Sequence, residues 1–276
     1  TLILDLDKLG FPDDVLKQYT QLTTQPYGMI LVTGPTGSGK TSTLYTTLAK
    51  INSPQNKIIT LEEPVEYQLN GVNQIQVNQK IGMSFASGLR SIVRQDPDII
   101  LVGEIRDRET AEIAIQSALT GHLLFSTLHT NDAAGAITRL LDMGVESFLL
   151  SSTLLGVLAQ RLVRVICPEC KRRIEPEERL LRSMEISPDE AGEIQFFGGK
   201  GCEACRYTGF KGRTAIFEYL PVNGRIRKEI IQKSSAEQIK DVAVKAGMLT
   251  LRQDGWRKVR GGVTTIPEIL KVTLEN

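Results

Sequence analysis

A glycine-rich segment ahead of a helix-forming stretch carries the clearest chemistry in this sequence. It follows a short apolar run rich in β-branched residues and matches the pattern G-x-x-x-x-G-K-[ST] in full. In such a loop the backbone N–H groups turn toward phosphate oxygens, Lys40 supplies a charge to the β and γ phosphates, and the Thr41 hydroxyl is a ligand for Mg²⁺. The predicted nucleotide-binding residues are Gly34, Pro35, Thr36, Gly37, Ser38, Gly39, Lys40, Thr41 and Ser42.

Two strand-like apolar runs end in acidic residues. One run leads to Glu104 and the other to Glu62 and Glu63. In an open α/β sheet, ligands bind outside the carboxyl ends of the strands, where a carboxylate can position Mg²⁺ or water. Many P-loop ATPases place an Asp just before the catalytic Glu, whereas this chain has Gly103. The alternative for each run is a solvated strand end or, for the second, an acidic loop before Pro64.

The two histidines of the chain, His122 and His129, flank a third apolar run. Thr127 and His129 come at its carboxyl end, on the expected ligand side of the sheet. They suit a sensor of the γ-phosphate, although a histidine at a strand end is also a common structural residue.

All four cysteines fall into two C-x-x-C pairs separated by residues 171–201. Two such pairs can enclose one tetrahedral Zn²⁺ with four thiolates and no open position, which predicts a structural site. A redox role is the alternative, but no thioredoxin-like βαβ unit surrounds either pair. The predicted zinc ligands are Cys167, Cys170, Cys202 and Cys205.

These candidate groups need a scaffold that brings strand ends together, and the sequence alternates strands with helices over its first 160 residues or so. The pattern predicts a mostly parallel α/β sheet covered on both faces. The apolar stretch 148–159 is expected to be a buried helix, too short to span a bilayer. Four further helices are expected at 225–233, 236–246, 249–260 and 266–272.

The chain has 276 residues, of which 41% are hydrophobic and 24% charged, as in an ordinary folded protein. It begins without Met, which suggests that an upstream region is missing. Its start lacks the basic segment and cleavage site of a signal peptide, so we expect a cytoplasmic protein. The predicted parts are a linker at 1–25, an ATPase core at 26–162, a tetracysteine metal-binding subdomain at 163–213 and a helical C-terminal module at 214–276.

Four segments stand in the order GPTGSGKT, TLEEPVEY, RQDPDIILVGEIRD and TGHLLFSTLHTNDA. They resemble the Walker A, Asp, Walker B and His boxes of the motor ATPases of type II secretion and type IV pilus systems, and the resemblance runs through essentially the whole chain. It implies a RecA-like P-loop core that hydrolyses ATP with Mg²⁺. By the same resemblance, Glu62 is the candidate general base, Glu104 the Walker B acid, and His129 with Thr127 the phosphate-sensing end. Relatives often have Asp at the position of Glu63.

The paired cysteines place the chain among assembly motors, because the related retraction motors lack them. Residues 148–164 look more like the type II secretion branch, with a type IV pilus extension motor as the alternative. The resemblance also implies a homo-hexamer in which an N-terminal domain lends arginines to the nucleotide site. Its implied partners are an inner-membrane platform protein and cytoplasmic linker proteins, through which the motor associates peripherally with the inner membrane.

Two functions of other classes are weighed against this one. One is a nucleotide-dependent switch that binds NTP and signals through a partner. A GTP switch needs an N-K-x-D segment, which the sequence lacks. A nucleic-acid translocase needs a basic or aromatic channel, and a net charge of +1 with 5% aromatic residues offers little to build one, so no nucleic acid is expected as a partner.

Overall fold

A computed structural model describes residues 5–184 and 186–273. The chain divides into two compact units, each described by itself here. The first contains the chain up to Gln160 together with Tyr219–Met248, and the second contains Arg161–Glu218 and the chain from Leu249 onward. The helices near the C-terminus are thereby shared between the units, and the domain boundaries expected from the sequence stay a prediction.

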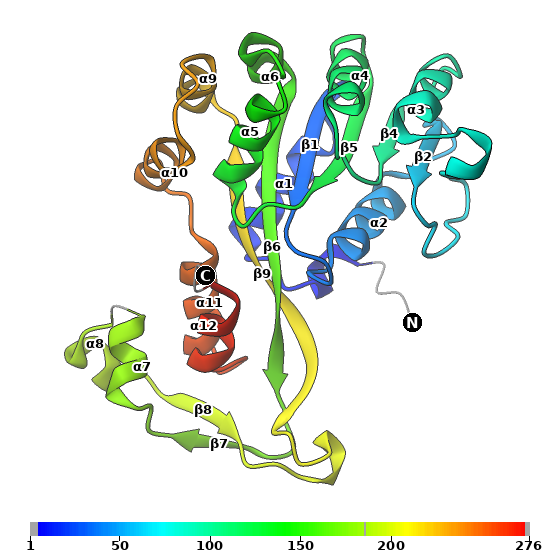
Figure 1. Ribbon diagram of the computed structural model, residues 1–276. Coiled ribbons are helices and arrows are strands. Elements are labelled where there is room, and N and C mark those ends of the chain that lie inside the picture. Colours follow the sequence, from blue (N-terminus) through cyan, green and yellow to red (C-terminus); the bar gives the residue numbers. More distant parts are fainter. Residues whose placement is uncertain (1–4, 185, 274–276) are drawn as a thin grey trace. The chain divides into compact units, whose positions relative to one another are not determined.

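A seven-stranded sheet has the order β3-β2-β4-β5-β1-β6-β9 (Figure 1). Every neighbouring pair from β3 to β6 is parallel, which confirms the predicted α/β fold. Every residue of β1, β2, β4 and β5 is buried, as expected for strands covered on both faces. The strands are β1 Gly28–Thr33, β2 Ile58–Glu62, β3 Asn73–Gln76, β4 Ile99–Val102, β5 Leu123–Leu128, β6 Leu154–Ile166 and β9 Phe210–Pro221.

Helices connect these strands in the first unit, with α2 packed against β1, α3 against β2, and α4 against β1 and β5. Side-chain caps mark where α3, α4, α5, α9 and α10 begin. Asp107, three residues after Glu104, accepts a hydrogen bond from the Thr110 N–H at 2.8 Å and so caps the start of α4. The helices are α1 Asp13–Leu22, α2 Lys40–Ile51, α3 Phe85–Val93, α4 Arg108–Leu119, α5 Ala133–Asp142, α6 Ser147–Thr153, α9 Gly224–Ile231 and α10 Ala236–Lys245, with 3-10 turns η1 Leu6–Lys8 and η2 Gln79–Ile81.

The expected helix at 148–159 is wrong in its second half. Helix α6 ends at Thr153, and β6 begins at Leu154 beside β1. Apolar residues without a clear period fit a buried helix and a buried strand equally well, and here pairing with the neighbouring strand decides. A Cβ on Gly156 would lie 2.7 Å from Leu22 Cδ1, so the close packing of α1 on β6 explains the glycine.

The second unit contains the antiparallel pair β7 Lys171–Ile174 and β8 Phe196–Gly199. The Arg164 guanidinium donates two hydrogen bonds to the Glu268 carboxylate, at 2.6 and 2.9 Å, and lies 4.1 Å from the centre of the Phe210 ring. The helices are α7 Glu178–Ser183, α8 Pro188–Gly192, α11 Leu251–Arg260 and α12 Ile266–Thr273, with a 3-10 turn η3 Glu203–Cys205. Among the described residues of the chain, no helix has both the length and the apolar character needed to cross a membrane.

Candidate nucleotide site and cysteine cluster

The sheet register brings the candidate catalytic segments to one edge. Thr33 at the end of β1 pairs with Leu128 at the end of β5, and Val102 at the end of β4 pairs with both Leu61 and Ser126. The loops that follow these strands therefore start at a common level. They carry the glycine-rich loop, Glu104, Glu63 and His129, and Glu62 is the last residue of β2 itself.

The glycine-rich loop joins β1 directly to α2. Gly37 and Gly39 have φ angles of 79° and 90°, in the left-handed region that glycine adopts without strain. Gly39 is the N-cap residue of α2 and has no side chain to cap the helix. The backbone N–H groups of the first turn are therefore available to a ligand at the helix N-terminus. The Lys40 ammonium donates to the carbonyls of Gly34 at 2.8 Å and Pro35 at 3.1 Å.

The remaining loop residues differ in exposure. Ser38 is 3% exposed, and among the described residues its Oγ has no hydrogen-bond partner. Gly34 is also buried, and Gly39 and Lys40 are half-buried. The exposed contact residues include the predicted magnesium ligand, and they are Pro35, Thr36, Gly37, Thr41 and Ser42.

Glu104 lies at the centre of a charged cluster. One carboxylate oxygen forms an ion pair with Arg106, and the other lies 3.1 Å from His129 Nε2. Arg106 also pairs with Glu63, at 3.1 Å, and Gln79 donates to the same Glu63 carboxylate at 3.2 Å. The hydrogen bond to Glu104 raises the pKa of Arg106, so the guanidinium stays charged throughout the physiological range. The structure thus brings Glu104 and His129 together, and Arg106 links Glu63 to Glu104 by pairing with both carboxylates.

Glu62 has different surroundings, although it is the immediate neighbour of Glu63. Its side chain is buried and accepts hydrogen bonds from the hydroxyls of Tyr45 and Thr60 and, at 3.2 Å, from the amide of Gln74. Burial, followed by the contact with Glu62, raises the pKa of Tyr45, so its hydroxyl keeps the proton that it donates. Three of the roughly four acceptor positions of the carboxylate are therefore in use.

Thr127 supports the segment that carries Glu104. Its hydroxyl donates to the Gly103 carbonyl at 2.7 Å, and its own carbonyl accepts from the Ile105 N–H at 3.1 Å. A Cβ on Gly103 would lie 3.2 Å from the Leu61 carbonyl oxygen, closer than side chains ordinarily approach. The tight fit of this segment against β2 explains why the chain has glycine where other P-loop ATPases have Asp.

Sequence reasoning missed Tyr45, Arg106 and Gln160. Arg106 has a weak signal, since it follows Glu104 by two residues in a loop after a strand. Gln160 directly precedes Arg161 at the end of an apolar run. Its partners Ser38 and Thr43 lie far away in the sequence, so it has no local signal. Tyr45 has no local signal, because its partner Glu62 lies on another element.

The four cysteines form a cluster in the second unit, with all Sγ atoms within 4.8 Å of one another and no disulfide among them. Three of the Sγ–Sγ distances are 3.7, 3.8 and 3.9 Å. Four sulfurs at about 2.3 Å from one tetrahedral zinc would lie about 3.8 Å apart. The spacing of the donors therefore fits a zinc ion.

Backbone N–H groups surround the sulfurs of this cluster. Gly201 donates to Cys170 Sγ, and Cys202 and Gly209 donate to Cys205 Sγ, at 3.2 to 3.3 Å. Burial opposes ionisation of Cys205, but these two N–H groups together with hydrogen bonds from the Cys202 and Cys170 thiols lower its pKa to about 6. The loops meet so closely that a Cβ on Gly199 would lie 2.0 Å from the Gly209 oxygen.

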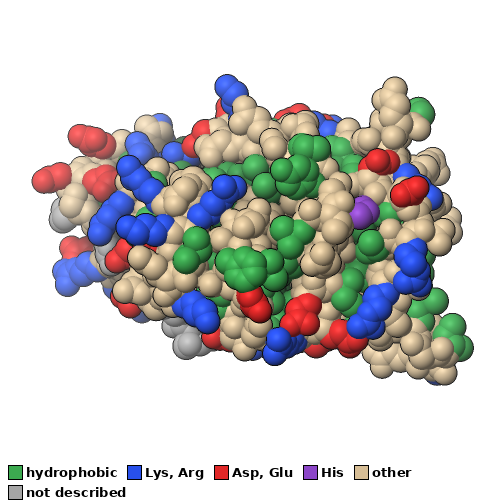
Figure 2. All heavy atoms as spheres, turned by 90° about the horizontal axis from the view of Figure 1, so that it is seen from above, with side chains coloured by type: hydrophobic (Ala, Val, Ile, Leu, Met, Phe, Trp, Pro, Cys, Tyr) green, Lys and Arg blue, Asp and Glu red, His purple; other side chains and the backbone are tan. Residues whose placement is uncertain are grey.

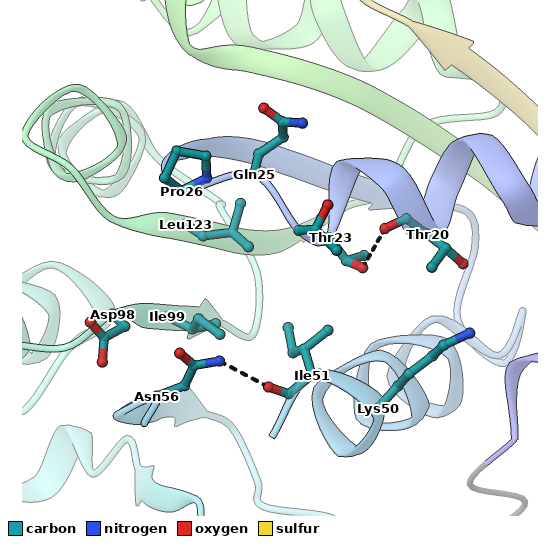
Figure 3. A pocket seen from close by; sticks show the side chains of 11 residues that line it. Thr20, Thr23, Gln25, Pro26, Lys50, Ile51, Asn56, Asp98, Ile99 and Leu123 are labelled. Atoms are coloured by element: carbon teal, nitrogen blue, oxygen red, sulfur yellow. Dashed lines mark hydrogen bonds between the residues drawn. The ribbon is translucent and has the colours of Figure 1, made fainter. Parts of the chain in front are cut away.

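A cavity of about 560 Å³ lies at the other edge of the sheet (Figure 3). It is bordered by Ile99 and Leu123, which begin β4 and β5, and by the Lys50 end of α2. Two hydrogen bonds join residues of its lining, one from the Thr23 hydroxyl to the Thr20 carbonyl and one from the Asn56 amide to the Ile51 carbonyl. None of its lining residues is a predicted site residue, so this cavity is separate from the nucleotide site.

Comparison with known proteins gives concordant matches. The profile of the family described as "Type II/IV secretion system protein" matches residues 1–271. The chain is 52% identical to the type II secretion system protein E of Xanthomonas campestris over 276 residues, which is 99% of this chain and 48% of that protein. It is 50% identical to the type IV pilus assembly ATPase PilB of Thermus thermophilus over 273 residues, 99% of this chain and 31% of that protein. The chain thus spans half or less of these two relatives.

Solved structures share the fold. The pilus retraction motor PilT with bound ADP superposes with a TM-score of 0.72 at 32% identity, over 98% of this chain and 67% of that one. The ATPase DotB of Legionella pneumophila superposes with a TM-score of 0.69 at 22% identity, over 97% of this chain and 64% of that one, a likeness of fold alone.

Proposed function

The chain belongs to the type II/IV secretion system protein family, and from this we propose that it is the ATPase portion of a cytoplasmic motor. The observation that carries the proposal is the convergence, at one sheet edge, of a complete phosphate loop with the Glu104–His129 pair. A loop alone would only hold a nucleotide. An acid and a histidine beside it supply groups that can orient water and respond to the γ-phosphate.

The residue roles follow from this arrangement. Lys40 would exchange the Gly34 and Pro35 carbonyls for phosphate oxygens, and Thr41 would hold Mg²⁺, which neutralises charge on the phosphates. Glu104 is assigned as the Walker B acid, and Glu62 as the general base. His129 and Thr127 form the proposed phosphate-sensing end, the first through its contact with Glu104 and the second through Gly103.

The cysteine cluster is proposed to hold one structural Zn²⁺. Four thiolates leave no coordination position for a substrate, and the observed sulfur spacing supports this metal. The ion would stabilise the segment between the two cysteine pairs, residues 171–201, which carries few buried apolar side chains.

At the level of the assembly, we propose a homo-hexamer that acts on an inner-membrane platform protein, with cytoplasmic linker proteins, to build a pilus-like fibre for type II secretion. Association with the membrane would be indirect, through these partners. The cysteine pairs favour an assembly motor over a retraction motor, and residues 148–164 favour the type II branch. The similar identity to a pilus assembly ATPase keeps a type IV pilus extension motor as the second candidate.

The ATPase proposal is tested with Lys40→Ala and Glu104→Gln. We expect Lys40→Ala to reduce turnover by at least about 100-fold, since it removes a charge that stabilises the transferring phosphoryl group. Glu104→Gln should retain ATP binding and stop hydrolysis. Lys50→Ala, at the other end of α2, and Glu109→Gln, at the start of α4, are matched controls that should hydrolyse ATP like the wild type. Normal turnover by Glu104→Gln would show that the Walker B assignment is wrong.

Adding single-stranded DNA to the same assay separates a motor of this kind from a translocase. On the face seen in Figure 2, Lys and Arg side chains are interspersed with Asp and Glu, and they form no continuous basic stripe there. We expect no stimulation by DNA. A several-fold increase in turnover would favour the translocase instead.

The choice of branch is tested by replacing the matching segment of the Xanthomonas protein E, and separately of the Thermus PilB, with this chain. Secretion is scored in the first host and piliation in the second. We expect restored secretion without restored piliation. The opposite result would assign the chain to the pilus branch.

A further inference from the structure

Gln160 lies where strand β6 passes the phosphate loop. In the β1–β6 register Thr33 pairs with Ala159, so the next residue of β6 stands beside Gly34, the first residue of the loop. The approach is close, because a Cβ on Gly34 would lie 2.5 Å from the Gln160 carbonyl oxygen. Gln160 itself is only 2% exposed. A long polar side chain has thus been buried directly against the loop.

The buried amide of Gln160 makes one bond to the loop and one to the helix behind it. Its nitrogen donates to the Ser38 carbonyl at 2.9 Å, and its oxygen accepts from the Thr43 hydroxyl at 2.7 Å. A backbone carbonyl can only accept, so the nitrogen must face Ser38. Thr43 is fully buried in the second turn of α2 and holds the amide in this orientation.

The bond to Ser38 has a consequence for the next N–H group. The Ser38 carbonyl and the Gly39 N–H belong to one planar, trans peptide, in which the two groups point in opposite directions. A carbonyl held toward β6 therefore directs the Gly39 N–H away from β6. Gly39 has a φ of 90° and no Cβ to restrict its side of this peptide, so the hydrogen bond from Gln160 adds a constraint that glycine itself does not supply.

We propose that Gln160 is a positioning residue of the nucleotide site. It fixes the Ser38–Gly39 peptide so that the Gly39 N–H points toward the bound phosphates. Because the peptide is already oriented, the loop loses less conformational freedom when nucleotide binds. This inference rests on the proposed ATP-dependent function, although Gln160 touches no nucleotide itself.

The test uses Gln160→Leu and Thr43→Val in the full chain. Leucine fills a similar volume but cannot bond to Ser38, whereas Thr43→Val removes the second bond and leaves the first. The affinity for a fluorescent ADP analogue, the KM and kcat for ATP, and the thermal midpoint without nucleotide are measured for each. We expect Gln160→Leu to weaken binding and raise KM about tenfold, the effect of roughly one hydrogen bond. Thr43→Val should change the affinity and the KM by less than about threefold, although its thermal midpoint should fall about as much as that of Gln160→Leu.

A third variant, Gln160→Glu, puts a carboxylate against the Ser38 carbonyl and should weaken binding at least as much as leucine. The proposal would be overturned if, in all three variants, the loss of nucleotide affinity were simply proportional to the loss of thermal midpoint. It would also be overturned if Gln160→Leu bound nucleotide with wild-type affinity. Failure of the wild type to bind or hydrolyse ATP would instead refute the proposed function, so the two failures are distinguishable.

Discussion

Glu62 and Glu63 are adjacent, yet their carboxylates meet different partners. Glu62 is buried among Tyr45, Thr60 and Gln74, and Glu63 is partly exposed beside Arg106. Burying a carboxylate is costly unless donors compensate it. The three donors around Glu62 therefore stabilise the junction of β2, α2 and β3.

The general-base role of Glu62 is tested by comparing a substitution of Glu62 with one of Tyr45, which donates a hydrogen bond to it. We expect Glu62→Gln to lower kcat by about 100-fold or more while nucleotide affinity stays near that of the wild type. Tyr45→Phe removes a donor but leaves the carboxylate able to accept a proton, so it should keep most of the turnover. Steady-state kinetics and nucleotide titration of both variants provide the measurement.

Glu63→Gln serves as the neighbouring control, since it loses only the contacts with Arg106 and Gln79. A large loss of kcat in Glu63→Gln, together with near-normal turnover in Glu62→Gln, would assign the base to Glu63 instead.

The Arg164–Glu268 pair gives a pH dependence of stability. The hydrogen bonds from Arg164 lower the pKa of Glu268 below its usual value. The pair therefore stabilises the fold above the carboxyl's ordinary pKa, and this stability is lost as the pH falls through the lower, folded-state value. We expect Glu268→Gln to cost about 2 kcal/mol at pH 7 and progressively less below pH 4, followed by thermal unfolding.

Glu178→Gln is the matched control for that experiment. Its carboxylate pairs with Arg182 at 2.9 Å, but both side chains are more than 80% exposed. An exposed pair of this kind contributes little, so the variant should unfold within about 0.5 kcal/mol of the wild type. Equal effects of the two substitutions would contradict the role given to Arg164.

At the scale of elements, the sequence predicted what local patterns control. The apolar runs of β1, β4 and β5 and the four C-terminal helices are confirmed, because periodicity and caps define them. Only residues 154–159 of β6 were predicted as helix, and β3 and β9 were not predicted at all, because pairing with neighbouring strands is what makes these segments strands. The contacts of Gln160 and Tyr45 join elements distant in the sequence, and no local pattern encodes them.

The cysteine cluster predicts a metal-dependent element. We expect one zinc per chain by elemental analysis. Chelation should release this ion and loosen residues 165–212, because the loops around the cluster would lose their shared centre. Hydrogen exchange with and without chelator measures the loosening. Cys170→Ser should bind less zinc and show the same local loosening without chelator, and unchanged protection of 165–212 in the metal-free protein would count against a structural zinc.

At the scale of the molecule, the chain forms two units that share the long strands β6 and β9. The nucleotide site lies wholly within the first unit and the cysteine cluster within the second. The resemblance to hexameric motors implies that an N-terminal domain lends arginines to the nucleotide site, and the chain spans half or less of the two relatives compared above. ATP hydrolysis by the chain and the association of its subunits can therefore be measured separately.

Specific ATPase activity should accordingly rise with protein concentration as subunits associate. Sedimentation velocity over the same concentrations reports the oligomeric state, and activity is expected to follow the population of hexamer. Adding back the N-terminal region of a relative should increase both. Activity that is independent of concentration would argue that the single chain is catalytically sufficient.

The two carbonyls that hold Lys40 have a thermodynamic consequence. Nucleotide binding at this lysine is an exchange of acceptors, in which phosphate oxygens replace the carbonyls of Gly34 and Pro35. The binding enthalpy seen by calorimetry then reports the difference between two sets of hydrogen bonds, and it should be smaller than a count of new contacts suggests. The same exchange frees two backbone acceptors, so nucleotide binding changes the local solvation of the loop as well as its charge.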